Sequence, residues 1–329
     1  MTRTELDAAG ITDPSLRDSY RICRELNARH GKTFFLATRL LAPDQRPAVH
    51  ALYGFARRAD DILDEFDPRL TTGDRAARLG TLAAQFAQGD ADGDPVLAAV
   101  LHTAESYRIG DDLFDAFLTS MRMDLSVTDY PDRAALDVYV YGSAEVIGLQ
   151  LLPILGTACP ESEAAPYAAA LGKAFQLTNF LRDIDEDLAR DRVYLPADEL
   201  AAFGVDRELL GWCRANGRVV PKVRRALAAQ HETTRRIYEF AREGIRCLAP
   251  RSRPCVSTAL LLYSDILGCI EDRDFDVFGR RATVGNRRRV RVGAEGLLRA
   301  WWARHGARDP RPSTTSHADS RSTGTGTMR

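Results

Sequence analysis

Apolar residues recur at helical spacing along almost the whole chain, and the alternation that indicates a half-buried β-strand is almost absent. Ala, Leu, Arg and Glu, all good helix formers, dominate these stretches. The pattern therefore predicts an all-α chain. The expected helices cover residues 15–28, 46–66, 72–87, 94–107, 111–124, 132–154, 164–189, 219–246, 254–272 and 281–305.

Proline and glycine collect between these helices without forming a long linker. The composition changes only from Arg308 onward, where the chain is rich in Pro, Ser, Thr and Gly and almost empty of apolar residues. Such a segment cannot bury enough surface to order itself. We therefore expect one all-α domain over residues 1–305 and a disordered tail over residues 306–329.

Charge and apolar content exclude several classes of protein. The 45 Lys and Arg balance 46 Asp and Glu, and a formal net charge of -1 gives no general attraction to nucleic acid. No apolar run approaches the roughly 20 residues of a transmembrane segment, and the N-terminus lacks the apolar core of a secretory signal. These features predict a cytoplasmic protein that binds no nucleic acid.

The cysteines are scattered, with no C-x-x-C pair. This spacing favours buried, reduced thiols over a disulfide framework or a zinc site, and the sequence assigns them no function. They are Cys23, Cys159, Cys213, Cys247, Cys255 and Cys269.

An acidic segment, ARRADDILDE (56–65), places Asp60 and Asp64 one helical turn apart. On a helical wheel both aspartates share a face with Tyr53 and Arg57, opposite an apolar stripe. A solvated outer face explains this arrangement by itself. However, Asp60 and Asp64 form a like-charged i,i+4 pair, which costs roughly 0.2–0.5 kcal/mol. A face that holds a ligand is therefore the alternative.

A second acidic segment, FQLTNFLRDIDEDLARDRVYLP (175–196), favours that alternative. Gln176, Asn179, Asp183 and Asp187 form a polar line that is separate from the apolar stripe of the same helix. Amide and carboxylate oxygens at i, i+4 and i+8 are the ligands that Mg²⁺ prefers. Two such helices that face each other would clamp a magnesium–diphosphate cluster between them.

Other cofactor sites fit the sequence poorly. Di-iron bundles also use carboxylates on facing helices, but they need Glu-x-x-His pairs, and no histidine here stands three residues after a glutamate. The chain has neither a G-x-x-x-x-G-K-[ST] loop nor a strand-linked G-x-G-x-x-G. A P-loop or Rossmann nucleotide site is therefore not expected.

Two further blocks, at residues 139–156 and 261–281, accompany the acidic segments, and the first acidic segment is part of a longer block. HGKTFFLATRLLAPDQRPAVHALYGFARRADDILDE (30–65) contains the first segment, YVYGSAEVIGLQLLPILG (139–156) precedes the second, and LLYSDILGCIEDRDFDVFGRR (261–281) follows it. In this order the blocks resemble the signature blocks of the squalene/phytoene synthase family. Within the family, the bacterial phytoene-forming members are the most similar.

The resemblance implies a single-domain isoprenoid-synthase helical bundle around a central cavity. It also implies a prenyltransferase that joins two prenyl diphosphates head to head (1'-1) and depends on Mg²⁺ or Mn²⁺. The residues that match the two acidic metal-binding motifs of the family are Asp60, Asp64, Asn179, Asp183 and Asp187.

The resemblance also assigns residues to the substrate. Arg57 and Arg182 match the family's diphosphate-binding arginines, and Gln176 and Tyr141 match polar residues near the reacting carbons. Tyr263 and Arg280 match the C-terminal contributors to the site. The expected catalytic residues are Asp60, Asp64, Asp183, Asp187 and Tyr141.

The sequence departs from the family at one position. Many relatives carry serine after the histidine of this block, whereas the chain has Gly31 in HGKTF. A hydroxyl contact to diphosphate is therefore lost, and Lys32 or Thr33 is expected to replace part of it.

Diphosphates bring several negative charges into a mostly apolar cavity, which is costly unless they are neutralised. Magnesium held by the two aspartate faces would neutralise these negative charges, and Arg57 and Arg182 would contribute. Ionisation of the first prenyl chain gives an allylic cation, which the 2,3-double bond of the second chain attacks to form a cyclopropyl-carbinyl diphosphate. A second ionisation, rearrangement and proton loss follow, with water excluded. Either diphosphate or Tyr141 would guide the proton loss.

Three functions are compatible with these features. The leading expectation is the joining of two geranylgeranyl diphosphates to phytoene in carotenoid biosynthesis, without NADPH. A squalene or dehydrosqualene synthase that uses two farnesyl diphosphates is the alternative within the family. The alternative of a different class is a non-catalytic all-α subunit that binds lipid or supports an assembly.

The last expected helix combines arginines, at 287–289 and 291, with Leu297, Leu298, Trp301 and Trp302. A basic amphipathic helix with tryptophans can lie on an anionic membrane, which would place the enzyme peripherally at the inner face of the membrane. A helix packed on the domain with a solvated basic face is the favoured interpretation.

Overall fold

Helices form the regular structure throughout the computed structural model, which describes residues 2–64, 69–279 and 281–305. Within these residues the only β-type pairing consists of isolated bridges. The predicted all-α class is confirmed. The elements are α1 (Arg3–Ala8), α2 (Pro14–His30), α3 (Lys32–Thr38), α4 (Arg46–Asp64), α5 (Thr72–Gln88), α6 (Pro95–Tyr107), α7 (Asp111–Met123), α8 (Arg133–Val140), η1 (Tyr141–Glu145), α9 (Val146–Leu155), α10 (Glu161–Arg182), α11 (Ile184–Ala189), α12 (Ala197–Ala201), α13 (Arg207–Asn216), α14 (Pro221–Glu243), η2 (Gly244–Cys247), α15 (Arg253–Glu271) and α16 (Asn286–His305).

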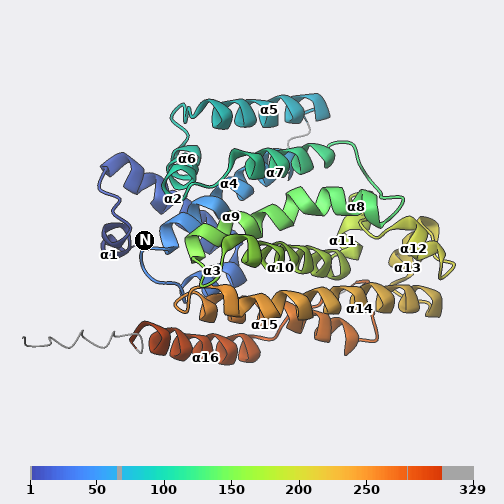
Figure 1. The fold of residues 1–329 in the computed structure, drawn as a ribbon. Coiled ribbons are helices and arrows are strands. Elements are labelled where there is room, and N and C mark those ends of the chain that lie inside the picture. The colour runs from blue at the N-terminus through green and yellow to red at the C-terminus, as the bar shows by residue number, and fades with distance from the viewer. Residues whose placement is uncertain (1, 65–68, 280, 306–329) are drawn as a thin grey trace, which may run out of the picture.

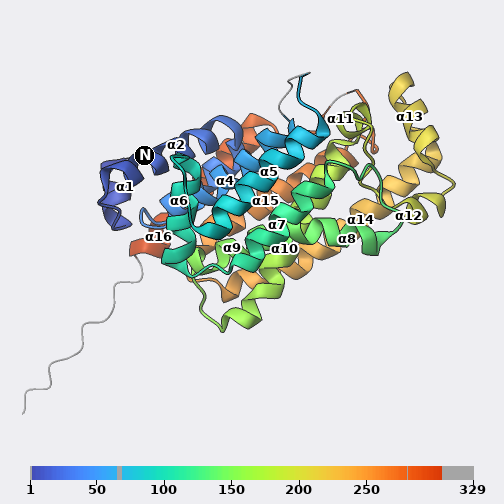
Figure 2. The ribbon, with the colours of Figure 1, turned by 90° about the horizontal axis from the view of Figure 1, so that it is seen from above.

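The helices stack in layers (Figure 1). α5 lies on one face and α16 on the opposite face, with α7, α10 and the α14–α15 pair between them. α10 packs against α9, η1, α14 and α15, and so occupies the centre of the stack. The turned view shows α1 and α13 at opposite ends of the molecule (Figure 2).

Each acidic helix buries its apolar face in a different part of the core. Leu52, Phe55 and Ile62 of α4 join a cluster built mainly from α2, α4, α6 and α7. Ala174 and Leu181 of α10 join a second cluster with α14 and α15. The apolar stripes that the sequence predicts are therefore buried, which leaves the polar faces of α4 and α10 for a site.

Two predicted helices are interrupted, and a third changes type in its last turn. The helix expected over residues 132–154 contains a π-helix, η1, between α8 and α9. The helix expected over 164–189 divides at Asp183 into α10 and α11, and the one expected over 219–246 ends as the 3₁₀ turn η2. π-helical turns occur often at functional sites, and Tyr141 begins this one.

Glycines allow η1 to touch its neighbours through the backbone. A Cβ atom at Gly142 would lie 2.2 Å from the carbonyl oxygen of Ala116 in α7. A Cβ atom at Gly172 of α10 would lie 2.2 Å from the carbonyl oxygen of Ala144 in η1. No side chain fits at either position without displacing a helix.

Two segments are long and apolar enough to cross a membrane, Arg133–Leu155 and Arg253–Glu271. Half or slightly less of each apolar window is buried inside the fold, 44% and 50% respectively. Both segments also pack on α10. Core helices pass the same length and hydropathy test, so the absence of a transmembrane segment stays a prediction.

Candidate active site

The first acidic motif lies at the C-terminal end of α4. Arg57 forms an ion pair with Asp61, one turn further along the helix, and Asp60 is partly exposed beside them. The Nε atom of Arg57 is buried and has no hydrogen-bond partner among the described residues. The side chain of Asp64 lies outside the described residues. Arg57 thus retains a buried donor beside an acidic face.

The adjacent arginine has a different partner. Arg58 is exposed and forms an ion pair of 3.1 Å with Asp94, which caps the N-terminus of α6. Arg57, Arg58 and Asp61 line one wall of a pocket of about 620 Å³ between α4 and α5. This pocket opens beside the motif and is not the central cavity that the family resemblance implies, which stays a prediction.

The second acidic motif extends across the junction of α10 and α11. The prediction of one continuous helix is wrong, because the backbone of Asp183 leaves the helical region with φ −104° and ψ 13°. Nevertheless Asp183 N–H donates to the Asn179 carbonyl at 2.8 Å, and Asp187 N–H donates to the Asp183 carbonyl at 2.9 Å. These i→i+4 bonds cross the break, so Asn179, Asp183 and Asp187 keep their helical spacing.

Asn179 offers an oxygen atom that nothing else uses. Its Oδ1 atom is buried and has no hydrogen-bond partner in the part of the chain that the structure describes. An unsatisfied buried acceptor costs about 1–3 kcal/mol, so this oxygen atom is available to a ligand that would satisfy it. The oxygen-only donor set of Asn179, Asp183 and Asp187 fits a hard divalent cation such as Mg²⁺ or Mn²⁺.

Two guanidinium groups hold the Asp183 carboxylate. Arg182 donates from Nε and Nη2 at 2.7 and 2.6 Å, and Arg281 donates from the same two atoms at 2.8 and 2.8 Å. Burial by itself would raise the pKa of Asp183, but the hydrogen bonds from both arginines lower it below the ordinary value. The carboxylate is therefore ionised and carries two counterions.

Asp187 has the opposite electrostatics. Burial, and then the negative charge of Asp183, raise the pKa of Asp187 to about 7. A cation bound between these carboxylates would remove that repulsion and favour the ionised form of both.

Arg281 is the site residue that the sequence did not single out. The residue expected there was Arg280, which lies outside the described residues. The tandem GRR at 279–281 was the available signal, but two adjacent arginines on irregular backbone cannot be distinguished by periodicity. The structure assigns the contact with Asp183 to the second arginine.

Tyr263 of α15 packs against aromatic rings of α3 and α10. Its ring packs 4.3 Å from the ring of Phe175 and 5.2 Å from that of Phe34, centroid to centroid. Burial raises the pKa of Tyr263 to about 12, and the charge of Arg182 and the Tyr53 hydroxyl also act on it. Tyr263 thus packs between Phe34 of α3 and Phe175 of α10, and its role at the site stays a prediction.

The remaining predicted residues lie at the edges of this arrangement. Gln176 is half-buried on α10, one turn before Asn179, whereas Lys32 is exposed on α3. Tyr141 is 43% exposed at the start of η1. No hydrogen bond or ring contact among the described residues joins Tyr141 or Lys32 to the acidic motifs.

Close packing explains why position 31 is a glycine. A Cβ atom at this position would lie 2.6 Å from Asn27 Oδ1 and 2.7 Å from the ring of Tyr53. A serine would have to displace the tyrosine that lies beside the first acidic motif. The absence of a side chain at Gly31 thus lets α4 pack closely against the junction of α2 and α3.

Comparison with known proteins shows the family of the chain. The model of the squalene/phytoene synthase family matches residues 27–288, which is most of the chain. The chain belongs to the squalene/phytoene synthase family. It is therefore an enzyme of the prenyltransferase type, and members of the family act on prenyl diphosphates.

Relatives in the family share about a third of the sequence. The phytoene synthase of Arthrospira platensis is 36% identical over 83% of this chain and 90% of its own length. The 15-cis-phytoene synthase of Synechocystis sp. is 35% identical, and the match covers 82% of each chain. Plant enzymes, such as the chloroplastic phytoene synthase of Daucus carota, are similar at 35% identity.

Solved structures of family members share the fold. A dehydrosqualene synthase in complex with a ligand superposes with a TM-score of 0.77 and 25% identity, over 86% of this chain and 96% of that one. A squalene synthase from Alicyclobacillus acidocaldarius gives a TM-score of 0.72 and 26% identity, over 82% and 100%. The predicted isoprenoid-synthase fold is confirmed.

Proposed function

We propose that this protein is a cytoplasmic phytoene synthase that condenses two geranylgeranyl diphosphates head to head and releases diphosphate in carotenoid biosynthesis. The observation that carries the proposal is the similarity to phytoene synthases over more than four-fifths of the chain. The reaction proceeds through a cyclopropyl-carbinyl diphosphate, and phytoene formation needs no NADPH.

We assign Mg²⁺ or Mn²⁺ to the oxygen atoms of Asp60, Asp64, Asn179, Asp183 and Asp187. When bound, the cation neutralises diphosphate and stabilises the charge on the leaving group. Support comes from the unpartnered Oδ1 atom of Asn179 and from the oxygen-only donor set.

The protein's own residues then have distinct tasks. Arg57, with its buried Nε atom, and Arg182 hold diphosphate oxygens, and Arg281 joins them from the segment after α15. Aromatic rings at Phe34, Phe175 and Tyr263 exclude water and present apolar surface to the prenyl chains. Tyr141 is assigned to proton loss, with diphosphate as the alternative base.

The direct test is product analysis. The purified protein is incubated with geranylgeranyl or farnesyl diphosphate, with Mg²⁺, and with or without NADPH. Phytoene from the C20 substrate without NADPH is the expected result. Failure to form any hydrocarbon from either substrate would contradict the proposal.

A second candidate function rests on a specific observation. The fold superposes on dehydrosqualene and squalene synthases with TM-scores of 0.77 and 0.72. A C30 hydrocarbon from farnesyl diphosphate, without activity on the C20 substrate, would establish that alternative. Dependence on NADPH then separates squalene from dehydrosqualene.

A matched pair of aspartates tests the metal assignment. Asp183→Ala should abolish Mg²⁺-dependent binding of inorganic diphosphate in calorimetry. Asp185→Ala is the control, since Asp185 lies off the ligand face and pairs with Arg214. Equal binding by both variants and the parent would contradict the assignment of the metal to Asp183.

We also propose that α16 contacts an anionic membrane peripherally. Val290, Leu297 and Leu298 are 71%, 49% and 63% exposed, while Val292 and Ala300 pack inward. The side chains of Trp301 and Trp302 lie outside the described residues. Co-sedimentation with anionic vesicles should decrease in Leu298→Glu, and equal binding to neutral vesicles would contradict an electrostatic contribution.

A further inference from the structure

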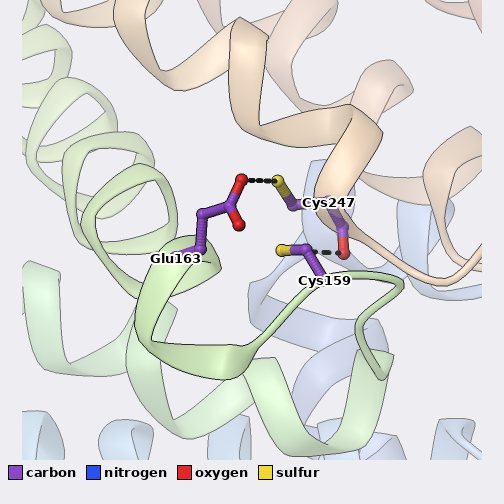
Figure 3. Close-up of side chains that lie close together, drawn as sticks. All are labelled: Cys159, Glu163 and Cys247. Carbon is purple, nitrogen blue, oxygen red and sulfur yellow. Dashed lines mark hydrogen bonds between the residues drawn. The ribbon is translucent and has the colours of Figure 1, made fainter.

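A cluster of soft and hard donor atoms lies far from the acidic motifs. Cys159, Glu163 and Cys247 each offer one ligand atom, and these atoms all lie within 4.8 Å of one another. Figure 3 shows both sulfur atoms and the Glu163 carboxylate pointing into a shared space. The cysteines are 88 residues apart in the chain, so spacing in the sequence gave no sign of this cluster.

The backbone holds the two thiols in place. Thr157 and Leu248 form an antiparallel bridge. Ala158 N–H donates to the Cys247 carbonyl at 2.7 Å, and Ala249 N–H donates to the Gly156 carbonyl at 2.8 Å. Two connections, α9–α10 and η2–α15, are thus joined by main-chain hydrogen bonds, and the juxtaposition of the thiols is built into the fold.

The contacts within the cluster are weak. Cys159 Sγ lies 3.9 Å from the Cys247 carbonyl oxygen, and Cys247 Sγ lies 4.0 Å from Glu163 Oε1. Both distances are at the outer limit for sulfur, and a thiol is a weak donor. Cys159 Sγ also donates to the Pro160 carbonyl at 3.4 Å, and the Arg246 guanidinium lies beside Cys247. Because a thiol is a weak donor, the strongest of these bonds is worth less than the two metal–sulfur bonds that would replace it.

We propose that Cys159, Cys247 and Glu163 bind a divalent cation of the Zn²⁺ class, separately from the acidic motifs. Two thiolates and a carboxylate are a tetrahedral donor set for zinc, with water as the fourth ligand. Metal–sulfur bonds of about 2.3 Å require donors roughly 4 Å apart, close to the separation observed. Mg²⁺ prefers oxygen atoms and would not compete here.

The solvent-exposed side of the cluster provides a path by which the cation can enter. Cys247 is buried, Cys159 is half-buried and Glu163 is exposed in the first turn of α10, so one side of the cluster faces solvent. On binding, each thiol gives up its proton to solvent and two sulfur–metal bonds form. The Zn²⁺ would then join the α9–α10 connection to the η2–α15 connection.

The cluster and the acidic motifs occupy opposite ends of one helix. Glu163 is in the first turn of α10, whereas Arg182 ends it. A helix of 22 residues is about 33 Å long, so the Zn²⁺ contributes to stability and takes no part in the chemistry at Asp183.

The test uses the full chain, reduced and freed of metal, with Co²⁺ as the probe. One equivalent of Co²⁺ should give a sulfur-to-cobalt charge-transfer band, which Zn²⁺ abolishes by displacement and excess Mg²⁺ does not. Cys159→Ser and Cys247→Ser should lose the band. Glu163→Gln, at an exposed position, should weaken binding by about tenfold or more.

Cys269→Ser is the matched control, because Cys269 is a half-buried thiol on α15 outside the cluster, and it should keep the band. Zn²⁺ should also raise the Tm of the parent and of Cys269→Ser, but not that of Cys247→Ser. Absence of the band in the parent, or its persistence in Cys159→Ser, overturns the proposal. A mass loss of two hydrogens with no cobalt binding would show a disulfide pair and would overturn it equally.

Discussion

The unpartnered oxygen atom of Asn179 should lower the stability of the metal-free protein, and the same atom is a proposed metal ligand. Both effects can be measured. Asn179→Leu removes the unpartnered acceptor at similar volume. We expect the metal-free variant to be as stable as the parent or more stable by up to about 1–2 kcal/mol in urea unfolding. Mg²⁺-dependent diphosphate binding should weaken by about tenfold or more.

The adjacent Thr178 is the control for that experiment. Its hydroxyl donates to the Ala174 carbonyl and bonds Tyr238, at 2.7 and 2.8 Å. Thr178→Val should lower stability by about 1–2 kcal/mol and leave Mg²⁺ affinity unchanged. A loss of stability in Asn179→Leu equal to that in Thr178→Val would show that Asn179 is a structural residue.

His50 makes the stability depend on pH. Burial, and then the charge of Arg24, lower the pKa of His50 from 6.5 to about 3. Below pH 6.5 the unfolded chain therefore takes up a proton that the folded chain refuses. The stabilisation is fully present above pH 6.5 and decreases toward pH 3, by up to about 1.4 kcal/mol per pH unit.

Urea unfolding between pH 7 and pH 5 measures this slope before most carboxylates titrate. His50→Gln should reduce the slope by the equivalent of one proton, whereas His30→Gln, at an exposed position, is the control. An unchanged slope in His50→Gln would show that the imidazole accepts a proton in the folded state.

For single residues, the sequence indicated which side chains share a helix face better than which groups they contact. The wheel placed Arg57 on the face of Asp60, and in the structure Arg57 pairs with Asp61 on the same helix while Arg58 pairs with Asp94. Arg281 was missed because the segment after α15 has no periodicity from which a side-chain direction follows. Whether the predicted ligands bind metal stays a prediction.

At the scale of elements, close backbone packing around η1 predicts a large effect from a single methyl group. In Gly172→Ala the added Cβ atom would meet the Ala144 carbonyl at 2.2 Å, so α10 and η1 must separate. We expect a loss of about 1–3 kcal/mol in unfolding free energy. Gly80→Ala in α5, where nothing lies within 4 Å, should be stabilising by about 0.5–1 kcal/mol. Equal effects at both positions would contradict the packing argument.

Long helices were predictable and short ones were not. α4, α5 and α7 end within a few residues of the predicted bounds because several turns repeat their apolar spacing. α1, α3, α12 and α13 were missed, since most of them are one or two turns long and show too little periodicity. The break at Asp183 was also unpredictable, because it accompanies contacts with Arg281, 98 residues away.

For the whole molecule, the domain boundary stays a prediction with a simple test. A chain that ends at His305 should show the same helical circular dichroism and a Tm within about 2 °C of the full chain, because residues 306–329 carry almost no apolar side chains. A Tm lower by several degrees would show that these residues pack on the domain. Product formation by both chains serves as the control for intact folding.

Fold class and family followed from the sequence because both depend on patterns along the chain. The pairing of Cys159 with Cys247 did not, since it requires the path of the chain from α9 to α15. The same limit applies to Tyr263, whose position between Phe34 of α3 and Phe175 of α10 is a property of the assembled helices.

The paired arginines on Asp183 have a consequence for the order of binding. On the proposed assignment, a lone Mg²⁺ ion must compete with two guanidinium groups already at that carboxylate. A diphosphate gives both arginines an alternative anion and frees the carboxylate for the cation. By thermodynamic linkage, each ligand then raises the affinity of the other. Occupancy of the site would follow the supply of prenyl diphosphate, and fluctuations in free Mg²⁺ would matter little while substrate is scarce.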